Sequence, residues 1–560
     1  MIKHFADHWE AVAEIIPDEI AISHAGVGRT WREYESRAAR LANALAEIGI
    51  GPDSKVAIYS RNSNEYLEAQ FAVLKVRGIV INVNYRYLES ELTHLFDDAD
   101  IDAVVFQARF APMLRAIRSA LPRIKTFIEV ADGTDDHLQG SADYEALIAA
   151  TPAMPPITRS EDDLYMFYTG GTTGKPKGVV YRIGDFYTGR CRTFELRGLP
   201  RPENRQALAS LIGELSAAKA LAKALPACPL MHGTGLWLGA VQPHLVGGHV
   251  VTVDSPRFDA HALCATIEQE RIGEVALVGD AFAKPMVVAA REAQAHGRPY
   301  DLSSLKVILS SGVMFSAESK RALLEYCDAT IIDAMGATEG AYALSTTSRR
   351  SPPTATAQFK LNDTTKVFTE DGREVIPGSG EVGAVASGGV VPLGYFKDPE
   401  KSAKTFRAIN GHRYSFPGDQ ALVNEDGTLT LLGRGSTCIN SGGEKIFPEE
   451  VEEAIKAHPA VRDCLVVGER DERLGERVIA VVSLEGDAPI DIMSIVDEAR
   501  RRLASYKLPK AVVVATEVLR KANGKPDYSW ARQVVEARPM DVTGPVSSPA
   551  SPVATATLSR

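Results

Sequence analysis

The residues most able to do chemistry in this chain lie in one glycine-rich stretch, 168–180, which reads Tyr-Thr-Gly-Gly-Thr-Thr-Gly-Lys-Pro-Lys-Gly-Val-Val. Glycines let backbone N–H groups come close to phosphate oxygens, hydroxyl groups add donors, and lysines add positive charge. The stretch therefore predicts a loop that cradles a polyphosphate such as ATP. Its expected contact residues are Thr169, Gly170, Gly171, Thr172, Thr173, Gly174, Lys175 and Lys177.

A Walker A loop is the first alternative, because it also ends in Gly-Lys and also grips phosphates. That motif has four residues between its glycines and a Ser or Thr after its lysine. Here Gly170 and Gly174 enclose only three residues, and Pro176 follows Lys175. An ordinary glycine-rich surface loop is the second alternative, and the length of the pattern argues against it.

The stretch resembles the signature of the class I adenylate-forming superfamily, usually written YTSGTTGxPKG, with Gly170 in place of the serine. This superfamily includes acyl-CoA synthetases, luciferases and the adenylation domains of peptide synthetases. The resemblance extends from about Thr30 to Asp527 and rests on the further segments described next. It implies an enzyme that joins a carboxylic acid to AMP.

Two of these segments, 307–314 and 331–340, each read as a buried strand that runs into a turn. Open α/β sheets bind ligands at the carboxyl ends of parallel strands, so both turns are candidate binding loops. They resemble the family's adenine pocket, with Met335 in place of the usual aromatic residue. The resemblance implies that Thr338 contacts phosphate and that Glu339 helps to hold Mg²⁺. Ser311, Gly312 and Gly336 complete this predicted pocket, and the two glycines are also expected to border the acid.

Segments nearer the C-terminus resemble the rest of the family's nucleotide site. Asp419 matches the aspartate that accepts hydrogen bonds from the ribose hydroxyls, although an Asp after Gly is, without that context, more often a turn residue. Arg434 would contact ribose or phosphate, and Lys525 stands at the position of the catalytic lysine. Gly442 and Gly443 would border the pantetheine tunnel of CoA, since a bulky side chain would block it.

The same resemblance places a hinge at Ser436, where the family usually has Asp or Lys. It also assigns His232, in Pro-Leu-Met-His-Gly-Thr-Gly, to the segment that borders the acyl pocket. A histidine in apolar surroundings is more often a structural residue, so pocket lining and packing both stay open for it. His232 is therefore a candidate for lining the pocket and is not assigned as a base.

Helix-like and strand-like segments alternate around these motifs. Strand-like runs at 55–59, 78–83 and 103–106 are separated by helical patterns at 65–75 and 90–98, and a leucine-rich segment at 208–225 predicts one further helix. Such alternation predicts an α/β fold with parallel sheets covered by helices. The expected domains are 1–435, with parallel sheets and a β subdomain for ATP and acyl binding, 436–540, a small mobile α+β domain with the catalytic lysine, and 541–560, a disordered tail.

Composition excludes several other classes of protein. The 560 residues carry 62 Lys and Arg against 72 Asp and Glu, without a long basic run, which argues against nucleic-acid binding. Six cysteines lie far apart without a CxxC pair, so neither a zinc site nor a disulfide framework is expected. No run approaches the ~18 apolar residues of a membrane span, and the N-terminus lacks a secretory signal, which predicts a cytoplasmic protein. Homo-oligomer formation is left open.

The leading hypothesis is an AMP-forming acyl-CoA ligase that uses ATP, Mg²⁺ and CoA for both half-reactions. The loop variant and the Ser-Gly-Gly-Glu-Lys junction are most similar to ligases for fatty acids and bulky polycyclic acids, such as steroid or terpenoid acids. A second hypothesis is a ligase that has lost adenylation, because Met335 and Ser436 depart from the family pattern. A third is a non-catalytic acyl- or nucleotide-binding protein, against which the retained charged residues argue.

Overall fold

The computed structural model describes residues 2–538, except 171–175, 254–257, 354–357, 435–436, 442–443, 472–474, 487–490, 504 and 522–523, together with residues 553–557. Contacts divide the chain into two compact units. The first comprises Met1–Thr356, Asn362–Thr365 and Ser387–Phe416, and the second comprises Ala357–Leu361, Lys366–Ala386 and Pro417–Arg560. The predicted domain boundary at 435–436 falls among residues that are not described, so the predicted domain assignment stays a prediction.

The first unit contains a five-stranded parallel sheet in the order β4-β3-β5-β6-β7. Alternate residues of β3 and β5 enter two separate cores: Val56 and Val105 pack with α2 and α3, whereas Tyr59 and Phe106 pack with α4 and α5. Helices thus cover both faces, as the nearly continuous apolar strands predict. The strands are β3 (Lys55–Tyr59), β4 (Ile79–Asn82), β5 (Ile101–Gln107), β6 (Thr126–Val130) and β7 (Ala142–Asp143).

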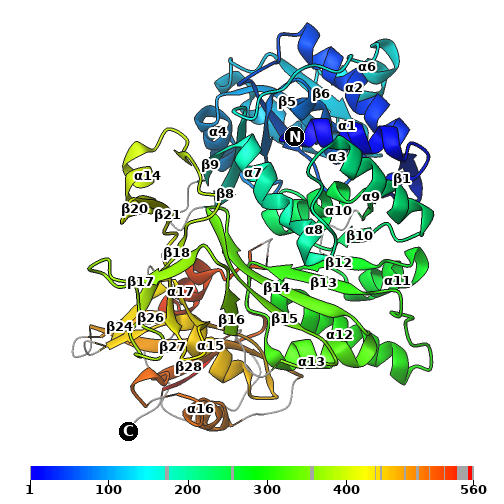
Figure 1. The fold of residues 1–560 in the computed structure, drawn as a ribbon. Coiled ribbons are helices and arrows are strands. Elements are labelled where there is room, and N and C mark those ends of the chain that lie inside the picture. The colour runs from blue at the N-terminus through cyan, green and yellow to red at the C-terminus, as the bar shows by residue number, and fades with distance from the viewer. Residues whose placement is uncertain are drawn as a thin grey trace. The chain divides into compact units, whose positions relative to one another are not determined.

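The helices around this sheet begin at side-chain caps. Helix α2 starts after Thr30, whose hydroxyl accepts the Glu33 N–H while the Glu33 carboxylate accepts the Thr30 N–H, a reciprocal capping box. The predicted helices at 65–75 and 90–98 are confirmed as α3 and α4. The helices, blue to cyan in Figure 1, are α1 (Phe5–Ile15), α2 (Trp31–Glu47), α3 (Asn64–Lys75), α4 (Glu89–Asp98), α5 (Ala111–Ile117) and α6 (Tyr144–Ala150), with short 3₁₀ turns η1 (Ala108–Phe110) and η2 (Arg118–Ala120).

A second sheet of this unit runs β2-β1-β11-β10-β12-β13-β14-β15, parallel from β1 to β14 and antiparallel at both ends. Helices α11, α12 and α13 lie along β12 to β14 (Figure 1) and share one apolar core with them. The strands are β1 (Ile20–His24), β2 (Val27–Thr30), β10 (Lys223–Pro226), β11 (His249–Thr252), β12 (Glu274–Leu277), β13 (Val307–Ser311), β14 (Thr330–Ala337) and β15 (Gly340–Thr347), and the helices are α11 (Ala260–Glu270), α12 (Gly279–Ala295) and α13 (Ala317–Tyr326).

The predicted helix at 208–225 is wrong beyond residue 217. Helix α9 (Arg205–Ala217) ends because Lys219 adopts a left-handed backbone conformation, φ +53°, and Leu225 lies in strand β10. The other elements of this unit are β8 (Leu164–Gly170), β9 (Pro176–Arg182), β19 (Gly394–Tyr395), β20 (Phe406–Ile409), β21 (His412–Ser415), α7 (Ile183–Arg190), α8 (Arg192–Leu196), the π-helix η3 (Thr234–Val241), α10 (Gln242–Leu245) and α14 (Pro399–Thr405).

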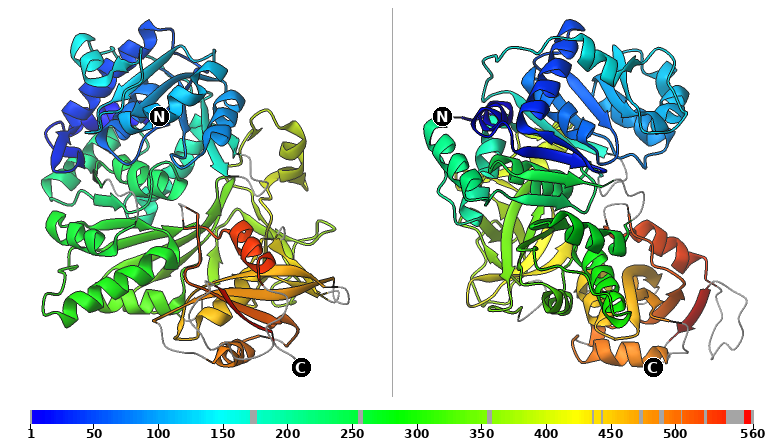
Figure 2. Two further views of the ribbon diagram at one scale, coloured as in Figure 1. Left: turned by 180° about the vertical axis from the view of Figure 1, so that it is seen from behind. Right: turned by 90° about the vertical axis from the view of Figure 1, so that its right-hand side faces the viewer.

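The second unit contains strands of two sheets. Strands β16, β23, β22 and β18 follow one another in the first, with β17 paired to β18, and β25-β24-β27-β28-β29 form the second, with β26 paired to β27. Figure 2 shows α17 in red against the orange strands of the second sheet. The elements are β16 (Gln358–Leu361), β17 (Thr365–Phe368), β18 (Gly383–Ser387), β22 (Asp419–Val423), β23 (Thr428–Arg434), β24 (Ile439–Ser441), β25 (Glu444–Ile446), α15 (Pro448–Lys456), β26 (Val461–Asp471), β27 (Gly475–Leu484), α16 (Ile492–Arg500), η5 (Ser505–Lys507), β28 (Ala511–Ala515), α17 (Tyr528–Glu536) and β29 (Val553–Thr557).

Residues 553–557 form strand β29, whereas the sequence predicts a disordered tail over 541–560. These residues pair antiparallel with β28, because that strand offers backbone donors and acceptors to an added chain. The rest of the expected tail lies outside the described residues. Among the helices that are described, none combines the length and the apolar character that a membrane crossing requires.

A buried carboxyl group lies in the core of the second unit. Glu452 of α15 is 4% exposed, and its Oε1 accepts the Val466 N–H of β26 at 2.9 Å. Burial raises the pKa of Glu452 to about 7, and the cation of Lys456 opposes the shift. The stabilising contribution of a group with a raised pKa is complete below its ordinary pKa and is lost as pH rises through the shifted value.

We therefore expect the free energy of unfolding of the wild-type protein to fall between pH 5 and pH 8. Glu452→Gln, which keeps an oxygen acceptor for Val466, should remove most of this fall. The wild-type protein should lose on the order of 3 kcal/mol relative to the variant across this range. Thermal or urea unfolding at a series of pH values measures this difference. Glu517→Gln, at an exposed position, is the control. Parallel pH profiles for wild-type protein and Glu452→Gln would contradict the assignment.

Candidate active site

The glycine-rich stretch lies at the tip of the β8–β9 hairpin. Thr169 pairs with Lys177 and Gly170 pairs with Pro176, so the hairpin holds both ends of the loop together. A Cβ at Gly178 would lie 2.8 Å from the Tyr168 ring, which is why this strand position takes glycine. The predicted contact residues Gly171, Thr172, Thr173, Gly174 and Lys175 lie outside the described residues, and their roles stay predictions.

Asn82, at the end of β4, fixes this hairpin. Its Nδ2 donates to the carbonyl oxygens of Tyr168 and Met231, and its Oδ1 accepts the Tyr168 N–H, each at 2.8 Å. The side chain is 6% exposed, so these bonds satisfy a buried amide. Asn82 is not among the predicted site residues, although its signal is present in the sequence: it is a polar residue at the end of a buried apolar strand.

The segment with His232 therefore starts beside the glycine-rich hairpin. Asn62 holds the residues before His232 in place, because the Asn62 Oδ1 accepts the Leu230 N–H at 2.8 Å. The π-helix η3 follows, and the Thr234 hydroxyl donates to the Ser311 carbonyl at 3.4 Å. The structure thus brings the segment that holds the predicted acid-binding residue His232 to Ser311, the residue before Gly312.

Thr338 and Glu339 form the tip of the β14–β15 hairpin, since Ala337 pairs with Gly340 on either side of them. The strand register shifts between Met335 and Gly336, just before the tip of the hairpin. The Tyr181 hydroxyl donates to the Thr338 carbonyl at 2.7 Å, which ties this tip to β9. Burial raises the pKa of the Tyr181 phenol, so it remains a donor. Met335 is 7% exposed and Gly336 is exposed.

Glu339 is the centre of a compact charged cluster. Its carboxylate is 6% exposed, and Oε1 accepts the Tyr395 hydroxyl at 2.7 Å. Lys177 Nζ lies 3.7 Å from the same oxygen and 4.2 Å from the Tyr395 ring centroid. Tyr395 reaches this position because β19 pairs with β9, with Tyr395 opposite Val179. The cluster places a cation and a carboxylate directly beside the base of the glycine-rich loop.

The cluster offers one carboxylate oxygen to a metal ion such as Mg²⁺. Oε2 of Glu339 has no hydrogen-bond partner in the described part of the chain, so one carboxylate oxygen can still bind a ligand. No group of three or more His, Cys, Asp or Glu side chains that could hold a metal occurs among the described residues. Mg²⁺ commonly binds through one or two carboxylates together with substrate phosphates, which is the arrangement that Glu339 suits.

In the second unit, Asp419 of β22 and Arg434 of β23 are direct cross-strand partners. The backbones of these two predicted nucleotide contacts are thus adjacent. At the neighbouring Gly433, φ is +121° and a Cβ would collide with the Glu449 carboxylate. Ser436, Gly442 and Gly443 lie outside the described residues.

Lys525 is exposed on a tight turn of the second unit. The Lys521 N–H donates to the Lys525 carbonyl at 2.9 Å, and the Gly524 N–H donates to the Lys521 carbonyl at 2.8 Å. Arg520 supports the turn, because Nη1 donates to the Gly524 carbonyl while its other nitrogens bind Asp463 in a bidentate pair at 2.6 Å. The sequence analysis did not identify Arg520, whose role depends on this contact with Asp463 in β26.

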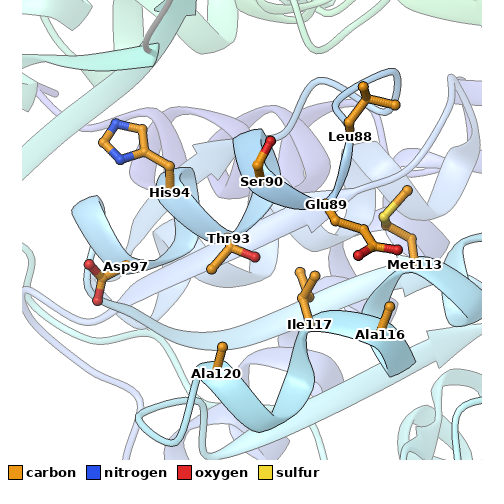
Figure 3. A pocket seen from close by; sticks show the side chains of 10 residues that line it. All are labelled: Leu88, Glu89, Ser90, Thr93, His94, Asp97, Met113, Ala116, Ile117 and Ala120. Carbon is orange, nitrogen blue, oxygen red and sulfur yellow. The ribbon is translucent and has the colours of Figure 1, made fainter.

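A separate pocket lies between α4 and the segment formed by α5 and η2, and Figure 3 shows the two helical segments facing each other across it. None of the predicted site residues lines it. Its lining comprises Leu88, Glu89, Ser90, Thr93, His94, Asp97, Met113, Ala116, Ile117 and Ala120. We assign it no part in the chemistry described above.

Comparison with known families shows the family of this chain. The sequence matches the family described as AMP-binding enzyme over residues 9–396, and the AMP-binding enzyme C-terminal domain over residues 450–525. The chain belongs to the AMP-binding enzyme family.

This AMP-binding enzyme is 40% identical to a 3-oxocholest-4-en-26-oate–CoA ligase of Rhodococcus rhodochrous, over 97% of each chain. It is 38% identical to a medium/long-chain-fatty-acid–CoA/3-oxocholest-4-en-26-oate–CoA ligase of Mycolicibacterium smegmatis, over 97% of this chain and 98% of the relative. The fold is similar to the crystal structure of an anthranilate CoA ligase with anthranoyl-AMP, with TM-score 0.81, 22% identity, and coverage of 95% and 97%. The predicted α/β fold, superfamily and CoA ligase class are confirmed.

The Glu339 cluster gives a test of the site. Tyr395→Phe removes the hydroxyl that orients Glu339 but keeps the ring beneath Lys177. A hydrogen bond to a charged group is worth about 1.5–3 kcal/mol, so we expect acid-dependent pyrophosphate release to fall at least about tenfold. Tyr326→Phe is the control, because the Tyr326 hydroxyl has no hydrogen-bond partner among the described residues. A rate for Tyr395→Phe equal to that of wild-type enzyme would refute the role of Tyr395.

Proposed function

We propose that this AMP-binding enzyme activates a hydrophobic carboxylic acid, fatty or polycyclic, with ATP and then transfers the acyl group to CoA. The observation that carries the proposal is the cluster of Lys177, Glu339 and Tyr395 at the base of the glycine-rich hairpin. The substrate class is supported by two relatives whose names specify fatty-acid and steroid-acid CoA ligases over nearly their whole length.

The first step activates the acid. A carboxylate oxygen attacks the α-phosphorus of ATP, the bond from that phosphorus to the bridging oxygen breaks, and pyrophosphate leaves with the electron pair. Two anions must meet in this step, so fixed positive charge lowers the barrier. The glycine-rich loop and Lys177 would hold the departing pyrophosphate, Thr338 would contact the α-phosphate, and Lys525 would bridge it and the attacking carboxylate.

Bound Mg²⁺ would supply further positive charge to the phosphates. Glu339 would hold the ion through Oε2, the oxygen that has no partner among the described residues. Asp419 and Arg434 would bind the ribose and phosphate of the nucleotide from their paired strands. Met335 is expected to lie against the adenine, where a thioether side chain can still pack on the ring.

The second step forms the thioester. The sulfur of CoA attacks the acyl carbon, the bond from that carbon to the AMP oxygen breaks, and the thiol proton is released. Lys525 serves only the first step in this proposal, and Gly442 and Gly443 border the pantetheine of CoA in the second. A cytoplasmic location and independence from nucleic acid stay predictions, and homo-oligomer formation stays open.

Pyrophosphate release measured with a panel of carboxylic acids, with and without CoA, tests the function. Acid-dependent release, followed by thioester formation when CoA is present, is the expected result. Thioester formation from a synthetic acyl-adenylate, without any pyrophosphate release from ATP, would select the ligase that has lost adenylation. Binding of acid and ATP without either reaction would select the non-catalytic protein.

We expect Lys525→Ala to lower adenylation by roughly 100- to 1,000-fold, the scale of removing one preorganised electrostatic contact. Thioester formation from a supplied acyl-adenylate should stay within about threefold of wild type. The two half-reactions are measured separately by pyrophosphate release and by thioester formation. Lys521→Ala, on the same turn, is the control, since its backbone N–H rather than its side chain supports the turn. Equal losses in both half-reactions would show that Lys525 has another role.

The hinge is tested at Ser436. Proline fixes φ near −65° and removes the N–H, so Ser436→Pro should hold one orientation of the following domain and suppress one half-reaction at least tenfold more than the other. Ser436→Asp, which restores a residue type usual in the family, should change either rate less than about threefold. The melting temperature is measured for each variant, so that unfolding is recognised. Equal effects on both half-reactions would place the pivot elsewhere.

A further inference from the structure

Arg190, the last residue of α7, is a cation in aromatic surroundings. Its guanidinium carbon lies 5.0 Å from the ring centroid of Phe186 and 5.4 Å from the ring of Trp237. The neighbouring rings stack in turn, with Tyr165 and Phe186 centroids 4.2 Å apart. All three rings are buried, whereas Arg190 is half-buried and keeps some accessible surface. Arg190 is therefore the member of this group that keeps the most accessible surface.

No carboxylate pairs with Arg190 in the described part of the chain. Its Nε is buried and has no hydrogen-bond partner among the described residues, and the ionisable groups that act on its charge are two phenols, of Tyr165 and Tyr181, and the cation of Arg192. Burial accordingly lowers the pKa of Arg190. Contacts with aromatic faces offset only part of the cost of desolvating a guanidinium. The protein thus keeps unused donor capacity at this position.

Two chains of contacts connect Arg190 with the candidate active site. Trp237, beneath the guanidinium, lies in η3, and a Cβ at Gly233, next to His232, would come 2.9 Å from the Trp237 ring. On the other side, Phe186 packs 5.0 Å from the ring of Tyr181, whose hydroxyl reaches the Thr338 carbonyl. Arg190 is therefore separated from the reacting end of the site by the Tyr181 side chain and adjoins the segment expected to line the acyl pocket.

We infer that Arg190 is a specificity-determining residue that binds an oxygen atom on the tail of the acid, remote from the carboxylate that is activated. This inference rests on the proposed function. The planar guanidinium matches an oxygen acceptor, and the apolar body of the acid lies along the neighbouring segment that contains Trp237 and is expected to line the acyl pocket. A tail carboxylate and a neutral hydroxyl offer the same acceptor chemistry. An acid without a tail oxygen leaves the buried donor unsatisfied.

The test compares dodecanoic acid with its ω-hydroxy derivative and with dodecanedioic acid in acid-dependent pyrophosphate release. Arg190→Met keeps the apolar stem and removes the donors. It should lower kcat/KM roughly 10- to 100-fold for the oxygenated acids, as expected for a lost hydrogen bond to a charged group, and less than about twofold for dodecanoic acid. The loss should lie mainly in KM, because the contact is made equally in the bound acid and in the transition state.

The two oxygenated acids separate the possible acceptors. A loss confined to dodecanedioic acid identifies an anionic tail group as the acceptor, and a loss for both acids identifies any tail oxygen. Arg192→Met, at an exposed position in α8, is the control and should change none of the three acids. If Arg190→Met does not fold, Arg190→Lys replaces it; it keeps the cation without the planar set of donors, and the same selective loss is expected at a smaller size.

Equal losses for all three acids would show that Arg190 only supports the fold, and no change for any acid would show that it binds no part of the substrate. Either result overturns the inference while the proposed function stands. Wild-type enzyme that releases no pyrophosphate with any carboxylic acid would instead overturn the proposed function, and the inference with it.

Discussion

The buried amide of Asn82 is the contact on which the first unit's candidate site depends. One side chain at the end of β4 bonds both backbone groups of Tyr168 and the carbonyl of Met231, so it joins the five-stranded sheet, the glycine-rich hairpin and the His232 segment. Tyr168 and Met231 lie 86 and 149 residues after Asn82 along the chain. Because an unsatisfied buried polar group costs about 1–3 kcal/mol, loss of any one of these parts leaves the amide and its partners uncompensated.

Several charged groups of the first unit keep capacity to bind a ligand of the opposite sign. Lys177 is held by a carboxylate and by an aromatic face at once, which orients the cation without neutralising it completely. Glu339 keeps one oxygen without a partner among the described residues, and Arg190 keeps donors that no described carboxylate uses. Burying such groups without a ligand destabilises the protein, because no interaction offsets the free energy of desolvation. A substrate that supplies the missing partner offsets this free energy.

Much of the fold follows from periodicity in the sequence. The strand at 55–59 has the predicted bounds, because a strand buried on both faces is apolar at nearly every position. The helix predicted at 208–225 fails for the opposite reason: leucines continue the helical pattern after Ala217, but the left-handed backbone at Lys219 breaks the helix and Leu225 enters a parallel strand. Strand β29 likewise exists only through its pairing with β28.

The sequence by itself determined the family and the CoA ligase class, and it predicts a phosphate-binding loop and most of the charged residues of the candidate site, because such chemistry needs particular residue types at short spacing. Only the tertiary structure identified Asn82, Tyr395, Arg520 and Arg190. Three of them bond a group far away in the chain: Asn82 bonds Tyr168, 86 residues after it, Tyr395 bonds Glu339, 56 residues before it, and Arg520 bonds Asp463, 57 residues before it. A long-range hydrogen bond leaves no local pattern, since its partners are chosen by the packing of strands and helices and not by their neighbours in sequence.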